Sequence, residues 1–97
     1  MSEETQRADV WLFRARLFKS RSGAGRFIEG GAVRLERAGA VSRLTKASAP
    51  VRPGDRLVYV RSGRLVRIGV TALGARRGPP AEARTLYVLE TAEEKEE

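Results

Sequence analysis

The spacing of apolar residues near the N-terminus predicts a first helix over roughly 10–19. At about 100° per residue, Trp11, Ala15 and Phe18 cluster on one side of such a helix. The other apolar side chains fall away from that side, so we expect the helix to pack on two sides. Asp9 is a good N-cap, because its carboxylate can accept a backbone N–H from the first turn. We expect Trp11 and Phe18 in the core, and not stacked on nucleic-acid bases.

A second helix is predicted to begin after Ser20 or Ser22, either of which can cap it, and to end at about Glu29. Its apolar stripe is compact and consists of Ala24, Phe27 and Ile28. Gly30-Gly31 ends the helix, because glycine takes the left-handed conformation without steric cost. The two glycines inside it cost up to about 1 kcal/mol each relative to alanine. Two explanations stay open, namely a close approach of another backbone and a frayed first turn.

After Gly31 the hydrophobic period changes to two, which indicates strands. The alternating runs cover 33–36, 57–60 and 65–70. Ser62-Gly63 is a hairpin-type connection, so the second and third runs should pair antiparallel. Residues 74–80 are expected to form a loop, and Pro80 could open a short helix over roughly 81–87. The pattern predicts an α+β fold, in which a helix-loop-helix packs on a small, mainly antiparallel sheet.

A chain of 97 residues suits one compact domain, because it has little surface left to bury in a second core. Residues 1–6 are polar and are expected to form a disordered lead-in. The end of the chain, from about Thr91, is expected to be a solvated acidic tail over 91–97.

The distribution of charge points to a polyanionic partner. Lysine and arginine total 19 against 12 acidic residues, for a formal net charge of +7. Residues 7–89 hold 18 basic and five acidic residues, a net charge of +13. A folded surface with that excess repels itself unless it binds polyanions, of which nucleic acid is the commonest. Because most of these cations are arginines, bidentate contacts to phosphate are favoured, although a merely soluble basic domain is the alternative.

Composition also excludes several classes of function. The chain has no cysteine and no histidine, which removes disulfides, thiol nucleophiles, imidazole bases and the usual zinc sites. We therefore expect no catalytic, cofactor or metal site, and no enzyme activity. No apolar run approaches the roughly 20 residues of a membrane span, and the polar start lacks the features of a signal peptide. We expect a cytoplasmic monomer that does not bind membranes.

The N-terminal spacing resembles a known RNA-binding domain, the S4 domain named after a protein of the small ribosomal subunit. The residues that carry the resemblance are Arg7-Ala8-Asp9, Leu12, Arg16, Ser20-Arg21, Ala24, Ile28, Gly31 and Val33, followed by Gly54-Asp55 before a strand. An S4-type domain over 7–70 is implied. Family members usually carry an Asn-Gly turn after the first strand, whereas this chain has residues 36–40, Glu-Arg-Ala-Gly-Ala. The tip of that hairpin therefore departs from the family.

A second resemblance narrows the family. Residues 76–83, with Leu86-Tyr87 after them, resemble the C-terminal extension of the bacterial heat shock protein 15 family, as does the run from Trp11 to Arg21. This implies an extension over 71–90. It also implies a small ribosome-associated, heat-shock-related protein that binds the free large ribosomal subunit with a stalled nascent chain on transfer RNA. Such a protein helps to recycle that subunit.

A helix-loop-helix presents a shallow ridge that suits the sugar-phosphate edges of folded RNA, with non-specific single-stranded RNA or DNA as further ligands. The candidate RNA-binding residues are Arg7, Arg14, Arg16, Lys19, Ser20, Arg21, Arg26, Arg34, Arg76 and Arg77. Four of these cations, at 16, 19, 21 and 26, are expected to converge on neighbouring phosphates. Each could instead be a solvated surface charge. We expect Asp9 to pair with an arginine and not to act as a catalytic acid.

The leading hypothesis is a non-enzymatic factor that binds structured ribosomal RNA. One alternative is the RNA-binding accessory module of an RNA-modifying enzyme, although no residues remain for a catalytic domain. Another is a DNA-binding helix-turn-helix regulator, which needs exposed base-reading side chains on its recognition helix. The second helix offers mainly Arg26 and Glu29 for that purpose.

Overall fold

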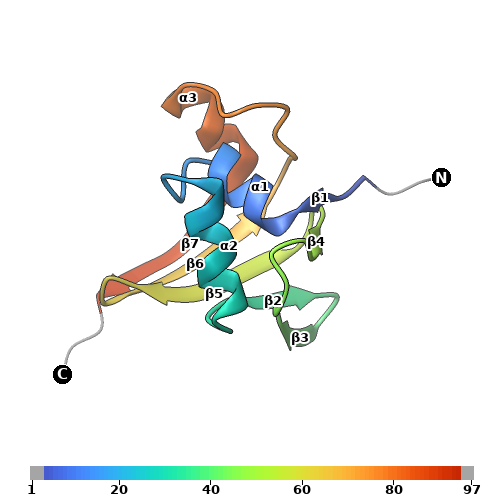
Figure 1. Ribbon diagram of the computed structural model, residues 1–97, viewed down its shortest axis with the longest axis vertical. Coiled ribbons are helices and arrows are strands. Elements are labelled where there is room, and N and C mark those ends of the chain that lie inside the picture. The colour runs from blue at the N-terminus through green and yellow to red at the C-terminus, as the bar shows by residue number, and fades with distance from the viewer. Residues whose placement is uncertain (1–3, 95–97) are drawn as a thin grey trace.

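A computed structural model of the protein describes residues 4–94 and arranges them in two layers (Figure 1). A five-stranded antiparallel sheet forms one layer, and helices α1 (Ala8–Arg14) and α2 (Arg21–Glu29) cover one of its faces. A C-terminal extension containing the short helix α3 (Pro80–Ala83) lies beside α1. The predicted α+β class, a helix-loop-helix on a mainly antiparallel sheet, is confirmed.

The sheet has the strand order β3-β2-β5-β6-β7, and every neighbouring pair is antiparallel. Its strands are β2 (Arg34–Arg37), β3 (Ala40–Arg43), β5 (Arg56–Arg61), β6 (Arg64–Val70) and β7 (Tyr87–Glu94). Ser62 and Gly63 join β5 to β6 with φ of 53° and 75°, as a tight primed hairpin requires. The predicted hairpin is confirmed. β3 was not predicted, because all of its residues are exposed and their pattern shows no buried face.

Helix α1 ends earlier than the sequence suggested. It stops at Arg14, five residues before the predicted end at 19, and the N–H of Ala15 bonds back to the carbonyl of Trp11. Arg16 then takes a φ of 61°, which reverses the chain and lets the N–H groups of Leu17 and Phe18 bond to the Leu12 carbonyl. A residue with positive φ cannot continue a right-handed helix. The reversal still buries Phe18, as predicted, because it turns that ring into the core.

Helix α2 agrees closely with its prediction. Ser20 is the N-cap, and its Oγ accepts the N–H of Gly23 at 3.0 Å. The helix ends at Glu29, and Gly31 takes the left-handed conformation with a φ of 81°. A Cβ added at Gly25 would lie 3.2 Å from the Cβ of Ala47. Close approach of another segment therefore explains this glycine.

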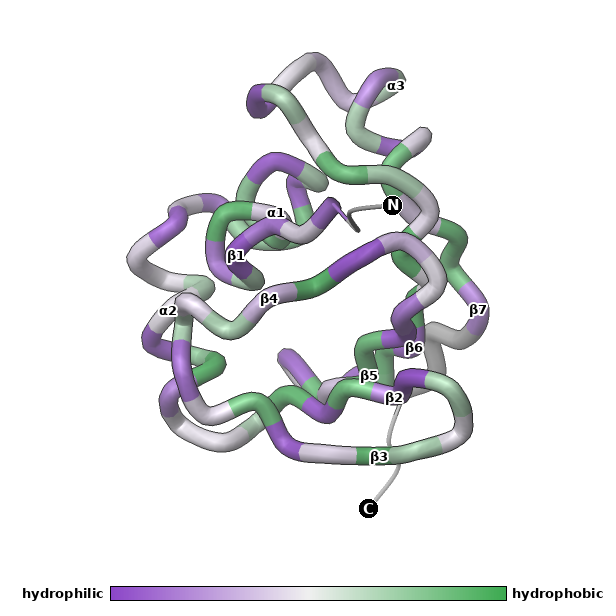
Figure 2. The backbone as a smooth tube through the Cα atoms, turned by 90° about the vertical axis from the view of Figure 1, so that its right-hand side faces the viewer, coloured by the Kyte–Doolittle hydropathy of each residue, from purple (hydrophilic) through white to green (hydrophobic). Residues whose placement is uncertain are grey.

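The core lies between the two helices and the sheet. Its largest fully buried side chains include Trp11, Leu12, Ile28, Leu57 and Ile68. In Figure 2 hydrophobic and hydrophilic positions alternate along much of the chain. The Nε1 of Trp11 donates to the Ala72 carbonyl at 2.9 Å, so the predicted core tryptophan also binds the start of the extension. Each buried side-chain polar atom in the described part of the chain has a hydrogen-bond partner.

Both ends of the described chain are more ordered than predicted. Strand β1 (Gln6–Arg7) pairs antiparallel with β4 (Pro50–Val51), so Gln6 does not belong to a disordered lead-in. Its side-chain amide exchanges two hydrogen bonds with the backbone of Gly74, at 2.7 and 3.2 Å. β7 continues through residue 94, although an acidic tail was expected from Thr91. Backbone pairing with β6 accounts for this difference, and residues 1–3 and 95–97 of the two predicted end segments lie outside the described part.

The extension also differs in detail from its prediction. Instead of one helix over 81–87, it has α3 followed by a 3-10 turn over Arg84–Leu86. β7 then begins at Tyr87, because this residue pairs with Val70 at the end of β6. Leu86 is buried, and it packs the extension against the core.

Candidate nucleic-acid interface

Asp9 is a buried carboxylate in the first turn of α1 that holds two arginines. Its side chain is only 6% exposed, and its two oxygens accept hydrogen bonds from Arg7 at 3.1 and 3.0 Å. Arg21 adds a longer bond from its Nε at 3.4 Å, and the N–H of Val10 adds one at 2.8 Å. The expected pairing with an arginine is confirmed. The expected capping role is wrong, because Arg7 is the N-cap residue and Asp9 lies within the helix.

The Asp9 carboxylate is ionised despite its burial. Burial alone would raise the pKa of this carboxyl, because desolvation disfavours the charged form. The hydrogen bonds from Arg7, the Val10 N–H and Arg21 outweigh that effect and lower its pKa below the usual value. The same hydrogen bond to Asp9 raises the pKa of the Arg7 guanidinium. A fixed negative charge therefore orients two cations at the protein surface.

Beside this carboxylate lies a shallow depression of about 530 Å³ between α1 and α2, called here the Asp9 depression. Three of its lining residues are the exposed cations Arg7, Arg21 and Arg26. Within the described residues the side chain of Arg26 has no hydrogen bond or ion pair, and neither has the side chain of Glu29 at the edge of the depression. Arg26 is consequently available to an anion that approaches this surface.

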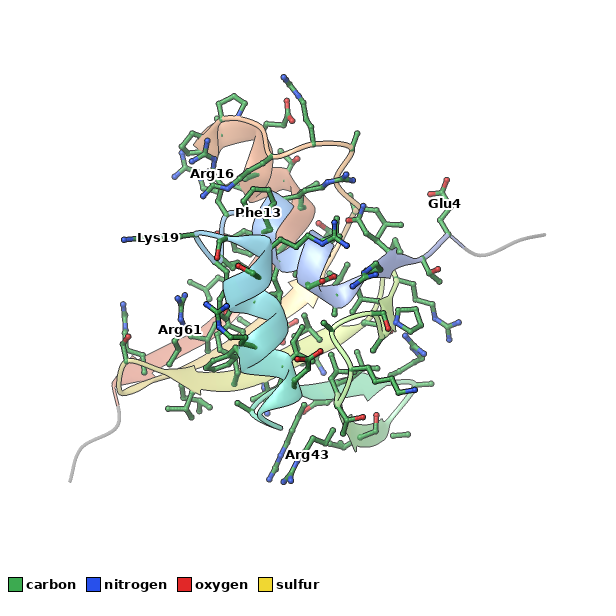
Figure 3. All side chains as sticks on the ribbon, in the orientation of Figure 1. Glu4, Phe13, Arg16, Lys19, Arg43 and Arg61 are labelled. Carbon is green, nitrogen blue, oxygen red and sulfur yellow. The ribbon has the colours of Figure 1, made fainter. Side chains whose placement is uncertain are left out.

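Lys19 and Ser20 lie in the turn that leads into α2. Lys19 is exposed and extends away from the molecule in Figure 3, and it has no partner in the part of the chain described. Ser20 is exposed too, but its hydroxyl already accepts the capping bond from Gly23. Its predicted contact with RNA would thus have to share that oxygen.

Three of the predicted contact arginines hold the extension against α1. Arg14 donates to the Gly74 carbonyl at 2.6 Å, and Arg16 donates through Nε to the Gly78 carbonyl at 2.5 Å. Arg77 returns the contact from the extension, with its Nε 3.2 Å from the Phe13 carbonyl and its guanidinium 4.9 Å from the centre of the Phe13 ring. Figure 3 shows Arg16 and Phe13 beside the extension. These cations have an intramolecular structural role that the sequence did not reveal.

The four cations expected to converge do not share one surface, and Lys19 lines neither of the two depressions that hold the others. Arg21 and Arg26 line the Asp9 depression, whereas Arg16 lines a separate depression together with Arg77. The reason is the early end of α1: with a φ of 61°, Arg16 leaves the helical path on which the i, i+3 spacing with Lys19 was based.

Arg76 lies on the exposed loop of the extension, as predicted, but it has an acidic partner. It binds Glu82 through two hydrogen bonds, at 2.8 and 3.2 Å, while 68% of its side chain stays exposed. The hydrogen bonds to Glu82 raise the pKa of the Arg76 guanidinium. Arg76 is therefore partly neutralised, whereas its neighbour Arg77 has no acidic partner among residues 4–94.

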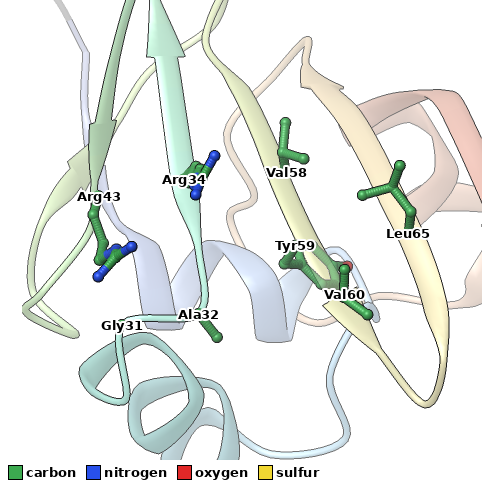
Figure 4. A pocket seen from close by; sticks show the side chains of 8 residues that line it. All are labelled: Gly31, Ala32, Arg34, Arg43, Val58, Tyr59, Val60 and Leu65. Atoms are coloured by element: carbon green, nitrogen blue, oxygen red, sulfur yellow. The ribbon is translucent and has the colours of Figure 1, made fainter. Parts of the chain in front are cut away.

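Arg34 lies apart from the helix-loop-helix, on the other face of the sheet. Leu35 is buried against the helices, so alternation along β2 points Arg34 away from them. Arg34 pairs in register with Arg43 of β3, and Figure 4 shows both beside an apolar strip formed by Val58, Val60 and Leu65. The sequence did not single out Arg43, because β3 itself gives no periodic signal.

The Gly54-Asp55 motif has a structural use. Gly54 takes a φ of 98°, and the buried Asp55 carboxylate binds Arg37 at 2.8 and 2.7 Å and the Arg52 N–H at 2.9 Å. This cluster anchors the turn before β5 to β2.

Three aromatic residues form a cluster beside α2, and one of them, Phe18, was predicted for the core. The rings of Phe18, Phe27 and Tyr59 lie 5.2 to 5.9 Å apart, and the guanidinium of Arg61 lies 3.9 Å above Phe18. Burial raises the pKa of Tyr59 to about 12. In the described residues there is no group of acidic side chains able to hold a metal ion, and no helix long and apolar enough to cross a membrane.

Two comparisons with known proteins bear on this arrangement. The S4 domain family matches residues 6–36, which include β1, α1 and α2. The solved trimeric structure of heat shock protein 15 from Vibrio cholerae superposes with a TM-score of 0.78 at 30% sequence identity, covering 90% of this chain and 83% of that one. The chain belongs to the heat shock protein 15 family. No curated protein matches it in sequence.

Membership of the heat shock protein 15 family, together with the S4 match, makes this chain an RNA-binding protein. Both are RNA-binding families and not catalytic ones. The S4 match includes eight of the ten predicted contact residues, and the exceptions are Arg76 and Arg77 of the extension. The expectation of a monomer has no support from this relative, whose solved structure is trimeric.

Proposed function

We propose that this protein is a non-enzymatic factor that binds structured ribosomal RNA on the large ribosomal subunit and acts in the recycling of stalled ribosomes. The observation that carries the proposal is the Asp9 depression, in which a buried carboxylate orients Arg7 and Arg21 next to Arg26, whose side chain has no partner among the residues described. The ribosomal part of the proposal is supported by the family to which the chain belongs.

The arrangement suits an RNA backbone better than a small ligand. Arg7 and Arg21 are 48% and 54% exposed, so each can contact a phosphate while Asp9 keeps its guanidinium in place. Arginine contacts to phosphate fix the position of a protein on RNA without reading its sequence. An open, shallow surface fits the wide minor-groove side and backbone of folded RNA. Shape and phosphate spacing would then determine the binding site.

The first test compares two single-charge variants. Arg26→Ala removes an unpaired arginine from the Asp9 depression, and Arg64→Ala removes an exposed arginine at the start of β6, which has no partner in the described part of the chain. We expect Arg26→Ala to weaken binding of a labelled ribosomal RNA fragment roughly tenfold, the usual worth of a charge-assisted bond. We also expect it to reduce the slope of log K against log salt by about 0.7–0.9. If the two variants have the same RNA affinity and the same salt dependence, the Asp9 depression is not the RNA-binding surface.

The second test concerns the ribosomal partner. The tagged full-length protein is sedimented through a sucrose gradient of cell lysate, with Arg26→Ala run in parallel. We expect the wild-type protein to co-migrate with free large subunits and the variant to stay near the top of the gradient. Migration with small subunits, or no migration with either subunit, would contradict the ribosomal assignment while leaving RNA binding itself to the first test.

A further inference from the structure

A second depression, called here the seam depression, lies between the end of α1 and the extension and has a volume of about 300 Å³. Three of its lining residues are arginines, Arg16, Arg77 and Arg84, and none is acidic. The nearby carboxylate of Glu82 is bound by Arg76 and does not line the depression. Tyr87, which is half-buried, is the aromatic residue among those that line this depression.

Several other arginines in the described part of the chain are paired with carboxylates. Arg7 binds Asp9, and Arg56 binds both Glu36 and Glu90. The seam depression is different, because in the described residues none of its three arginines has an acidic partner. Three positive charges around one small depression repel each other, and an anion at the centre removes that repulsion.

Two of the three guanidinium groups are already oriented. Arg16 and Arg77 each donate their Nε to a backbone carbonyl, at 2.5 and 3.2 Å, and Arg77 also lies against the Phe13 ring. These contacts use the inner edge of each guanidinium and leave its terminal nitrogens without a described partner. A planar group held in this way loses little entropy when it binds phosphate through those nitrogens. Arg84 is exposed and adds a third donor.

We propose that the seam depression binds one unpaired nucleotide of the RNA, with its phosphate between Arg16, Arg77 and Arg84 and its base against Tyr87. The inference rests on the proposed RNA-binding function and adds to it a site specific for single-stranded nucleotides. A volume of about 300 Å³ lies at the lower end for small-ligand pockets, so it fits one nucleotide but not a helix. Stacking on an aromatic ring does not depend on base identity, so the site has no strong sequence preference.

The test uses two labelled RNAs, a ribosomal stem-loop with a short single-stranded 3′ overhang and the same stem-loop with a blunt end. We expect the wild-type protein to bind the overhang RNA more tightly. Arg84→Ala should lose most of that preference, with an affinity for the overhang RNA lower by roughly tenfold, and should bind the blunt RNA as the wild type does. Tyr87→Leu should lose part of the preference through the loss of stacking. Arg64→Ala is the matched control and should retain the preference.

The outcomes separate this site from the main proposal. If the wild type binds neither RNA, the proposed function fails and the seam site fails with it. If Arg26→Ala lowers the affinity for both RNAs but Arg84→Ala binds them as Arg64→Ala does, the RNA-binding role of the Asp9 depression is supported and the seam site is refuted. If Arg84→Ala lowers the affinity for both RNAs equally, Arg84 contacts a phosphate but the depression does not bind a single unpaired nucleotide, and the proposal is refuted. Melting temperatures confirm folding, and Arg84 has no described contact whose loss would unfold the chain.

Discussion

Replacing Asp9 by asparagine should lower stability, because it removes the charge that holds Arg7 and Arg21. The side chain is 6% exposed and accepts three hydrogen bonds from the two guanidinium groups. Hydrogen bonds to charged groups contribute about 1.5–3 kcal/mol each when buried. Both arginines are about half exposed, so solvent screening reduces the total to about 2 kcal/mol. For a domain of this size that corresponds to a fall in Tm of about 8–16 °C.

The pH dependence of this effect follows from the lowered pKa of Asp9. Since the folded pKa lies below the unfolded value of about 3.9, the stabilisation is fully present above that pH. It is lost as the pH falls through the folded pKa. The Tm difference between the wild type and Asp9→Asn should therefore be largest at neutral pH and shrink in acid.

Thermal unfolding followed by circular dichroism at several pH values provides the measurement. Glu29→Gln is the control, because Glu29 lines the same depression but is exposed and has no partner in the described residues. Its effect should stay within about 0.5 kcal/mol. A Tm difference for Asp9→Asn that is constant from neutral pH to pH 2, or absent throughout, would refute the assignment of Asp9 as an ionised anchor.

Two further predictions concern packing. Gly74→Ala should destabilise the protein by about 1–3 kcal/mol. The added Cβ would lie 2.9 Å from the Arg14 Cβ and 3.0 Å from a Leu86 methyl group. An unchanged midpoint of unfolding in urea would contradict this tight contact. Tyr59 should ionise only near pH 12, so folding stability should fall as pH rises from about 10 toward 12, when the unfolded phenol ionises first. Absorbance titration of a Tyr87→Phe variant measures this, and ionisation of Tyr59 near 10 in the folded state would show that it is not buried.

Local sequence signals predicted those elements whose geometry is set within a few residues. Ser20 caps α2, and the Ser62-Gly63 turn joins two paired strands, because both features depend on near neighbours alone. The end of α1 could not be predicted in this way. The apolar residues up to Phe18 continue the helical spacing, yet the chain reverses at Arg16 to bring that ring into the core. Tertiary packing overrode a local pattern.

The candidate site shows the same limit. The sequence identified the cations and the pairing of Asp9 with an arginine, because charge and motif spacing can be read from the amino-acid sequence alone. It could not separate arginines with an intramolecular partner from those without one. Arg14 and Arg16 bind carbonyls 60 and 62 residues away along the chain, and Arg84 joins Arg16 only through the fold of the extension.

The attachment of the extension to α1 also has a consequence for folding kinetics. Gln6, Trp11, Arg14 and Arg16 all bond to the segment between residues 72 and 78, at sequence separations of 60 to 68. Contacts this distant form late, because the loop-closure entropy must be overcome before they contribute any stability. During synthesis the side chains of α1 therefore become fixed only after the segment up to residue 78 has been made. A nascent chain that stops short of residue 78 would lack the seam and expose Trp11 and Phe13 to chaperones.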